Sequence, residues 1–180
     1  ILLYEEFLWK QAEDGKEGES LRFWESSIYF VVLGRICKLE DDVNIDNVKK
    51  DQIPVLRRAS GGGTVLQGKG CLNYSLVLSK DKKPMLNDIR KSYQYILEKV
   101  TQALSQLRID SGYYPISDIA LKSNMKKISG NAQKRGRNYI LHHGTLLYDF
   151  DIQMIERYLK IPKAVPEYRQ NRSHEDFLVN

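Results

Sequence analysis

One long segment, residues 86–107, places the strongest constraint on the fold. Its apolar side chains recur at helical spacing along a single stripe: Ile89, Tyr93, Ile96, Leu97, Val100, Leu104 and Leu107. Asn87 or Asp88 stands where a side chain caps the start of a helix. An apolar stripe of this length must be buried against a second layer, so we expect the helix to cover a β-sheet, with Tyr93 in the packing.

Several shorter runs have the composition of strands that could form this sheet. Residues 27–33, 53–56, 72–78 and 139–148 are rich in β-branched, aromatic and other apolar side chains, and residues 116–121 and 126–128 form two briefer runs. The polar stretch 129–138 is expected to be a loop, and the charged stretch 38–52 a short helix or loop on the surface.

The two ends of the chain give weaker patterns. Residues 1–12 predict a helix with Leu3 and Phe7 on its apolar face, and since no cap precedes it, we expect a chain clipped at its N-terminus. Asp149 or Asp151 is expected to cap a short helix that ends before Pro162. The charged tail, residues 165–180, is expected to be irregular, with a further element beginning where the sequence stops. No repeat or linker divides residues 1–180, which indicates one domain.

Composition narrows the class of protein. The 180 residues are 42% hydrophobic, enough for one core, and no apolar run is long enough to span a membrane. Without a signal sequence, a soluble protein of the cytoplasm is expected, or of the mitochondrion in a eukaryote. Two cysteines and three histidines fit no zinc spacing, so no metal ligands are assigned. The net charge of +5 favours an acidic partner or substrate, but the scattered lysines do not indicate nucleic acid.

A glycine-rich stretch, RRASGGGTVL at residues 57–66, is the main candidate for a binding site. Three successive glycines let the backbone approach a ligand, and its N–H groups together with two arginines favour an anion. The alternative is a mobile turn between two strands. The stretch is not a P-loop, because Gly70 stands where a Mg²⁺-binding Ser or Thr is required and a strand-like segment follows.

Three segments, taken together, resemble a known family. RRASGGGTV at residues 57–65, KKISGNAQ at 126–133 and HHGTLL at 142–147 closely resemble, in order and spacing, the lipoate-protein ligase group of the biotin/lipoate ligase family. The segment LRFW at residues 21–24 is similar as well. The resemblance implies an α/β (α+β) fold, the catalytic fold of biotin and lipoate protein ligases, with a mixed, mostly antiparallel sheet flanked by helices.

The resemblance also implies a reaction. Lipoate and ATP would give lipoyl-AMP and pyrophosphate, and the lipoyl group would pass to a lysine on a lipoyl domain of a 2-oxoacid dehydrogenase or on a glycine cleavage carrier protein. Mg²⁺ is implied by the ATP chemistry rather than by any ligand cluster in the sequence.

Site residues follow from the matching positions. Lys127 is the candidate catalytic cation, since a cation beside the carboxylate and the α-phosphate lowers their repulsion; the alternative is a solvated surface lysine. Arg58 would bind the nucleotide. The resemblance implies three further sets of binding residues. A first loop consists of Gly61, Gly62, Gly63, Thr64, Val65 and Leu66, and a second turn consists of Gly130, Asn131 and Ala132. His143 and Gly144 would shape the lipoyl end of the pocket. His143 could equally be a hydrogen-bonded core residue, and His142 is the weaker candidate.

Two departures from the family pattern and three rival functions stay open. Many relatives carry His-Asp where Gln67 and Gly68 stand and Asn where Cys71 stands, and we interpret Cys71 as a small buried side chain. The closest rival is an ATP-independent octanoyl or lipoyl transferase that uses a cysteine; residues 111–126 and 145–180 contain none, which argues against it. A biotin ligase fits the motifs less well, and a non-catalytic lipoyl-adenylate-binding module is the third alternative. The additional C-terminal domain of some ligases is not recognised in this sequence.

Overall fold

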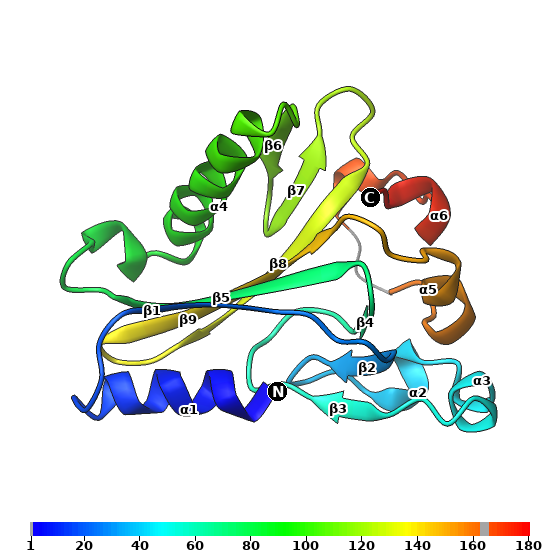
Figure 1. Cartoon of the computed structure of the whole chain (residues 1–180), viewed down its shortest axis with the longest axis horizontal. Helices are drawn as coiled ribbons and strands as arrows, with labels where there is room; N and C mark the ends of the chain where they lie inside the picture. Colours follow the sequence, from blue (N-terminus) through cyan, green and yellow to red (C-terminus); the bar gives the residue numbers. More distant parts are fainter. Residues whose placement is uncertain (1, 163–165) are drawn as a thin grey trace.

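A six-stranded antiparallel sheet forms the centre of the molecule (Figure 1). The computed structural model describes residues 2–162 and 166–180. The strands lie in the order β1-β5-β9-β8-β7-β6. Their bounds are β1 (Ser20–Trp24), β5 (Cys71–Ser79), β6 (Ser111–Tyr114), β7 (Asp118–Leu121), β8 (Lys127–Arg135) and β9 (Tyr139–Leu147). The mixed α/β fold predicted from the sequence is confirmed.

The long helix α4 (Ile89–Gln106) covers one face of this sheet, as its apolar stripe predicted (Figure 1). A short 3₁₀ turn, η1 (Pro84–Asn87), precedes it. Asp88 is the N-cap, and its carboxylate accepts a hydrogen bond of 2.8 Å from the Lys91 N–H. Tyr93 and Leu97 of the helix are buried against Ile119 and Ile140 of the strands, so this face carries one of the hydrophobic clusters of the molecule.

The opposite face is covered by α1 (Leu2–Glu13) and by a small second sheet (Figure 1). That sheet has the order β3-β2-β4, with β2 parallel to β3 and antiparallel to β4. Its bounds, with the two short helices beside it, are β2 (Phe30–Leu33), β3 (Val55–Arg57), β4 (Val65–Gln67), α2 (Leu39–Asp42) and α3 (Ile45–Lys50). Val31 and Leu66 of this sheet pack with Cys71 and Phe150 in a second cluster. The charged stretch 38–52 therefore contains helices, as expected.

The predicted apolar face of the first helix is wrong. Leu3 and Phe7 are 81% and 52% exposed, whereas Glu5 and Ala12 are buried. Small Ala12 allows α1 to lie close to β5 and β9, and a helix in that position turns Glu5 toward the sheet. The carboxylate of Glu5 is tolerated there because it meets three donor groups, described below.

The prediction that residues 129–138 form a polar loop is also wrong, because most of them belong to β8. This strand is paired on both sides, with β7 and β9. Its polar side chains bind one another across the sheet instead of facing solvent; the Gln133 amide, for example, contacts His142 Nδ1 at 3.1 Å. The second turn proposed at Gly130, Asn131 and Ala132 is therefore extended strand. Residues 20–24 form a further strand, β1, that the pattern did not predict.

The C-terminal part of the chain packs short elements beside β8. Helix α5 (Gln153–Tyr158) ends before Pro162, and although its N-cap is Ile152, the Asp151 carboxylate accepts a hydrogen bond of 3.1 Å from the Gln153 N–H. The tail, expected to be irregular, contains η2 (Glu167–Arg169) and α6 (His174–Phe177), while residues 163–165 lie outside the described residues. In the described part of the chain, no helix has both the length and the apolar composition that a membrane crossing requires.

Candidate active site beside the glycine loop

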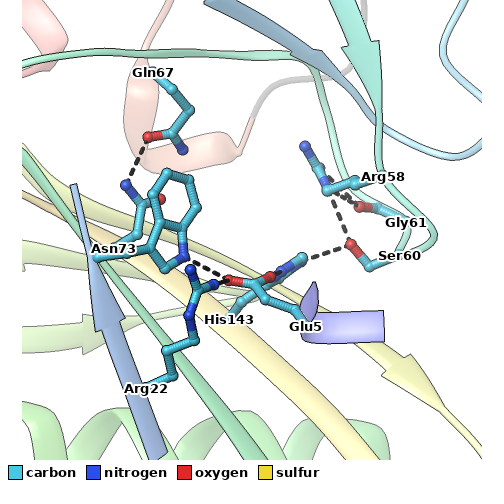
Figure 2. Close-up of polar contacts among 9 residues, drawn as sticks. Glu5, Arg22, Arg58, Ser60, Gly61, Gln67, Asn73 and His143 are labelled. Atoms are coloured by element: carbon cyan, nitrogen blue, oxygen red, sulfur yellow. Dashed lines mark hydrogen bonds and ion pairs between the residues drawn. The ribbon is translucent and has the colours of Figure 1, made fainter. Parts of the chain in front are cut away.

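Residues 60–64, here called the glycine loop, are shaped by the buried side chain of Arg58. Its guanidinium donates to the Gly61 carbonyl at 2.8 Å and to Ser60 Oγ at 3.0 Å (Figure 2). It also donates to the Gly63 carbonyl at 2.7 Å. In a trans peptide the N–H points opposite to the carbonyl, so the N–H groups of Gly62 and Thr64 point away from Arg58. Within the described residues neither N–H donates to a protein acceptor, which leaves both for an anion.

The glycine loop crosses the six-stranded sheet at Gly62. Its φ of +84° is one that a residue with a side chain rarely adopts, and a Cβ there would lie 2.9 Å from Arg58 Nη2. The same Cβ would lie 3.6 Å from the Cβ of Ala132, so the loop passes over β8 at this residue. The left-handed φ, together with the nearby Arg58 guanidinium, thus favours glycine at this position.

Lys127 lies farther along the same face of β8. Its ammonium is 2.8 Å from Asp118 Oδ1, and the other oxygen of Asp118 accepts a hydrogen bond of 2.7 Å from the Tyr168 hydroxyl. A Cβ placed on Gly130 would lie 3.0 Å from Lys127 Nζ, so the ammonium lies directly over that glycine. Gly130 and Ala132 are two residues apart in a strand and share a face, which brings the lysine and the glycine loop onto one surface.

A β-bulge explains how Lys127 reaches this surface. Ile119 of β7 pairs with Ser129, but the next residue, Ala120, pairs with Lys127, so Ile128 is an extra residue in β8. Ile128 is buried in the cluster under α4 together with Ile119. A bulge of this kind redirects the side chains beside it, and here it places the ammonium on the side of the sheet that the glycine loop covers.

His143 connects the loop to helix α1. Its Nε2 lies 2.6 Å from Ser60 Oγ, and its Nδ1 lies 2.9 Å from Glu5 Oε2 (Figure 2). Glu5 is only 3% exposed and also accepts a hydrogen bond of 2.6 Å from the Trp24 indole. Burial opposes ionisation of Glu5, but the bonds from His143 and Trp24 and the charge of Arg22 outweigh it, so the pKa of the carboxyl is lowered.

Sequence reasoning missed both Glu5 and Asp118. Glu5 shares a helical face with Trp9 and Ala12, at i, i+4 and i+7, so its burial could have been found by choosing that stripe instead of the one through Leu3. Asp118 carries no comparable signal, since only the pairing of β7 with β8 brings it to Lys127.

Two of the predicted site residues lie on the other face of the sheet. The side chain of Asn131 accepts a hydrogen bond of 2.5 Å from the Tyr74 hydroxyl and donates one of 2.8 Å to the Ser117 carbonyl. Gly144 is paired with Asn131, and a Cβ there would lie 1.9 Å from Asn131 Oδ1. His142 is fully buried on the same side, between Tyr74 and Tyr93. These residues brace the sheet beneath the site.

The last residue of the glycine loop, Thr64, leads directly into β4. Thr64 Oγ1 donates to Asp42 Oδ2 at 2.5 Å, and Leu66 is 4% exposed within the core under the small sheet. Val65 pairs with Val32 of β2. The side chains of Thr64 and Leu66 are therefore engaged within the protein, whereas the Val65 side chain is half-buried.

Gln67 and Cys71, two of the positions that depart from the family pattern, contact each other in the protein interior. The side-chain oxygen of Gln67, Oε1, accepts a hydrogen bond of 2.8 Å from the Asn73 amide (Figure 2). It also accepts one of 3.4 Å from Cys71 Sγ. Cys71 is 1% exposed, and burial raises the pKa of its thiol to about 12. The thiol is therefore protonated at neutral pH, which agrees with a small buried side chain and disfavours a nucleophile.

A basic hollow of about 450 Å³ lies on the far side of the loop from Lys127. It is lined by Glu6, Arg35, Arg57, Arg58, Ala59 and Lys134. Arg57 is not a free surface charge, because its Nη1 donates to the carbonyls of Gly34 and Cys37, at 2.9 and 2.7 Å. Among the described residues, no three His, Cys, Asp or Glu side chains gather as a metal site would require.

The sequence of this chain matches the model of a known protein family. The model of the lipoyl protein ligase A/B catalytic domain matches residues 2–179. The chain belongs to this family. It is 31% identical over 160 residues to a probable lipoate-protein ligase A of Mycoplasma pneumoniae, an alignment that covers 89% of this chain and 45% of that protein. The chain thus spans about half the length of the curated relatives it matches.

Solved structures of the ligase family support the same fold. A lipoate-protein ligase A crystallised with ATP has a TM-score of 0.82 and 28% identity, over 99% of this chain and 69% of that one. The bipartite lipoate protein ligase of Thermoplasma acidophilum, studied with its E2 lipoyl domain, has a TM-score of 0.80 and 26% identity, with the same coverage. An octanoyltransferase LipM of Clostridioides difficile is also similar, at 25% identity over 92% of this chain and 66% of that protein.

Proposed function

We propose that this chain carries out ATP-dependent ligation of lipoate: it joins lipoate to AMP and transfers the lipoyl group to a lysine of a lipoyl domain. One observation carries the proposal. The Lys127 ammonium lies over Gly130, and the glycine loop crosses the same face of β8 at Ala132, so a fixed cation and backbone N–H groups with no described protein acceptor lie along one surface. The ATP complex of the similar ligase supports the nucleotide.

In the first step two anions must approach each other. The lipoate carboxylate attacks the α-phosphate, and Lys127 between them lowers the repulsion and stabilises the charge that develops on the phosphate oxygens. Asp118 and Tyr168 hold the ammonium in place, since a flexible lysine would otherwise lose rotamer entropy on binding. Pyrophosphate leaves, and Mg²⁺ would enter with the nucleotide, because the described residues offer no carboxylate cluster to hold it.

Arg58 takes an indirect part in this proposal. Its guanidinium is 8% exposed and already bound to the glycine loop, and burial lowers its pKa. We therefore assign it the task of holding the loop carbonyls away from the anion, so that N–H groups and not carbonyl oxygens meet the nucleotide. The positive charge of the Arg58 guanidinium also attracts the nucleotide phosphates.

The second step needs an acceptor amine at the mixed anhydride. The lysine amine of a lipoyl domain attacks the acyl carbonyl, the acyl–phosphate bond breaks and AMP leaves with its charge still close to Lys127. The bipartite ligase studied with its E2 lipoyl domain supports this class of acceptor.

The cysteine-dependent transferase is the weaker alternative. Cys71 is buried with a raised pKa, and Cys37, which is half-buried, places its Sγ 3.4 Å from the Gly62 carbonyl, within hydrogen-bonding distance for sulfur. A general base for either thiol is absent from their described hydrogen-bond partners. These contacts favour ligation over transfer through a thioester.

Lipoate-dependent exchange of pyrophosphate into ATP tests the first step directly. We expect exchange with the unchanged chain and a loss of at least about a hundredfold in Lys127→Ala, as for the removal of an electrostatic catalyst. Lys126→Ala is the matched control, because among the described residues the ammonium of this neighbouring lysine donates only to the Glu175 carbonyl, at 3.4 Å.

Three results would lead to other functions. Transfer from an octanoyl carrier without ATP would assign the chain to the transferases. Tight binding of a non-hydrolysable acyl-adenylate without exchange would indicate a binding module. Equal exchange in the Lys127→Ala and Lys126→Ala proteins would remove the lysine from the mechanism.

A further inference from the structure

A continuous chain of buried hydrogen bonds runs from helix α1 to the glycine loop. Glu5 Oε2 is 2.9 Å from His143 Nδ1, His143 Nε2 is 2.6 Å from Ser60 Oγ, and Arg58 Nε is 3.0 Å from the same Ser60 oxygen (Figure 2). Glu5, Ser60 and Arg58 are 3%, 2% and 8% exposed. The His143 side chain is 15% exposed, so the chain joins three separate segments, α1, β9 and the stretch from Arg58 to Ser60, with little access to bulk solvent.

The protons in this chain can be assigned from the donor and acceptor capacities of its members. The ionised Glu5 carboxylate only accepts, so Nδ1 of His143 carries a proton. In the neutral ring Nε2 is then an acceptor, and the Ser60 hydroxyl donates to it while accepting from Arg58. Every member is satisfied in one orientation, so Glu5 selects the tautomer of His143, and the tautomer selects the direction of the Ser60 hydroxyl.

The order of residues is that of a Ser-His-Glu triad, but the contacts do not favour a nucleophile. Ser60 is 2% exposed, and Arg58 donates to its oxygen, so a carbonyl carbon has no approach to that oxygen. The Ser60 carbonyl is also held, by a hydrogen bond of 2.9 Å from the Arg35 N–H. Ser60 is thus held at its hydroxyl and at its carbonyl, which indicates a structural role. The Glu5–His143–Ser60 contact is called the tie from here on.

We propose that Glu5 is a positioning residue of the active site: acting through His143, it holds Ser60 and thereby keeps the N–H groups of the glycine loop in the arrangement that receives an anion. The contribution to ligand binding rests on the proposed function, whereas the ordering of the loop does not. Glu5 touches neither the loop nor Lys127 directly, and its described partners are His143, Trp24 and Arg22.

A double-mutant cycle in the free protein tests this coupling. The Arg35 amide reports on Ser60, because its exchange with solvent requires the bond to the Ser60 carbonyl to open. In Glu5→Gln the amide oxygen replaces only one of the two carboxylate oxygens that accept from Trp24 and His143, so the tautomer of His143 is no longer fixed at this end; Ser60→Ala removes the contact at the other end. We expect either change to speed exchange of the Arg35 amide about tenfold, the effect of losing a hydrogen bond to a charged group.

The combined variant decides between a tie and a general stabilising role. If Glu5 acts through His143 and Ser60, the double variant exchanges no faster than either single one, whereas independent effects multiply. Amides of β5 and β9 should keep their rates in every variant. Glu6→Gln is the matched control, since it removes the next carboxylate of α1, which is paired with Lys134 rather than with the loop.

Activity gives a second readout. A loop that spends less time in the receptive arrangement binds less well but reacts normally once occupied, so the KM for lipoate or ATP should rise about tenfold with kcat nearly unchanged. The imidazole ¹⁵N shifts of His143 should report a change of tautomer in Glu5→Gln.

Two outcomes would overturn the inference: multiplicative exchange rates in the double variant, or an acyl ester on Ser60 detected by mass spectrometry after incubation with lipoate and ATP. If pyrophosphate exchange is absent from the unchanged chain while the Arg35 amide behaves as expected, the proposed function fails and the tie stands.

Discussion

Lys127 and Gly130 lie on the same face of β8 although they are three residues apart. In a regular strand such residues face opposite sides, and here the extra residue Ile128 reverses the outcome. The position of the ammonium therefore depends on the backbone of β8 and on its pairing with Asp118.

Replacing Asp118 by Asn should reduce activity more than stability. The amide keeps an acceptor for the Tyr168 hydroxyl but loses the charge that holds Lys127 Nζ at 2.8 Å, so the ammonium is displaced. We expect kcat/KM for pyrophosphate exchange to fall about 10- to 100-fold, the usual effect of misplacing a catalytic group. Asp110→Asn removes the carboxylate of an exposed pair with Lys122 and should have no effect. Equal rates for the two variants would contradict the positioning of Lys127 by Asp118.

Adding a methyl group to Gly62 should destabilise the protein, whereas adding one to Gly61 should not. Gly62 has a φ of +84°, and a Cβ added to it would lie 2.9 Å from Arg58 Nη2. A Cβ added to Gly61 would have no neighbour within 4 Å. We expect Gly62→Ala to lower the free energy of unfolding by about 1–2 kcal/mol, the cost of a left-handed residue with a side chain. Urea unfolding measures this. If Gly61→Ala were destabilised as much, strain at residue 62 would not be the cause.

His142 should make the protein less stable as the pH falls. Complete burial, together with the nearby His143, lowers the pKa of His142 to about 3, while an unfolded chain binds the proton near its ordinary value of 6.5. Between these values the unfolded state holds more protons, so stability is present above pH 6.5 and is lost on acidification. From pH 7 to pH 5 the loss should be about 2 kcal/mol.

The comparison with His142→Gln isolates this residue, because all other titrating groups are shared. Urea unfolding at the two pH values should show a smaller loss in the variant. The same pH dependence in both proteins would mean that His142 is not held neutral by the core.

The two cysteines should differ sharply in reactivity. Cys71 is 1% exposed with a thiol pKa raised to about 12, whereas Cys37 is half-buried beside Gly62. Iodoacetamide at neutral pH should therefore modify Cys37 alone in the folded protein and both residues in urea. Peptide mass spectrometry gives the sites, and Cys37→Ser should take up no label when folded. A modified Cys71 in the native protein would show that the interior near Gln67 opens readily.

The parts of the fold that depend on local pattern were predictable. The stripe of α4 and the cap at Asp88 follow from helical spacing and hydrogen-bonding groups within one segment. Cys71 was correctly interpreted as buried, because a small apolar side chain in an apolar strand has few alternatives. The glycine loop was located by its residue types alone, although the use of Arg58 to hold it was not.

The parts that depend on contacts between distant segments were not predictable. β8 is polar because its side chains bind neighbours across the sheet, so its sequence has the composition of a loop. The bulge at Ile128 exists only relative to β7, and Asp118 acquires its partner through that pairing. Glu5 was overlooked for a similar reason. Its carboxylate can be buried because Trp24 and His143 donate hydrogen bonds to it, and both lie far from it in the sequence.

The burial of Glu5 has a practical consequence for anyone who expresses this protein. The fifth residue of the sequence contacts His143 and Trp24 from the first turns of α1, more than fifty residues ahead of the loop that it serves. A truncation, fusion or substitution that disturbs α1 would therefore also disturb Glu5 and, through His143, the glycine loop, so the properties of such a preparation would depend on whether this helix is intact.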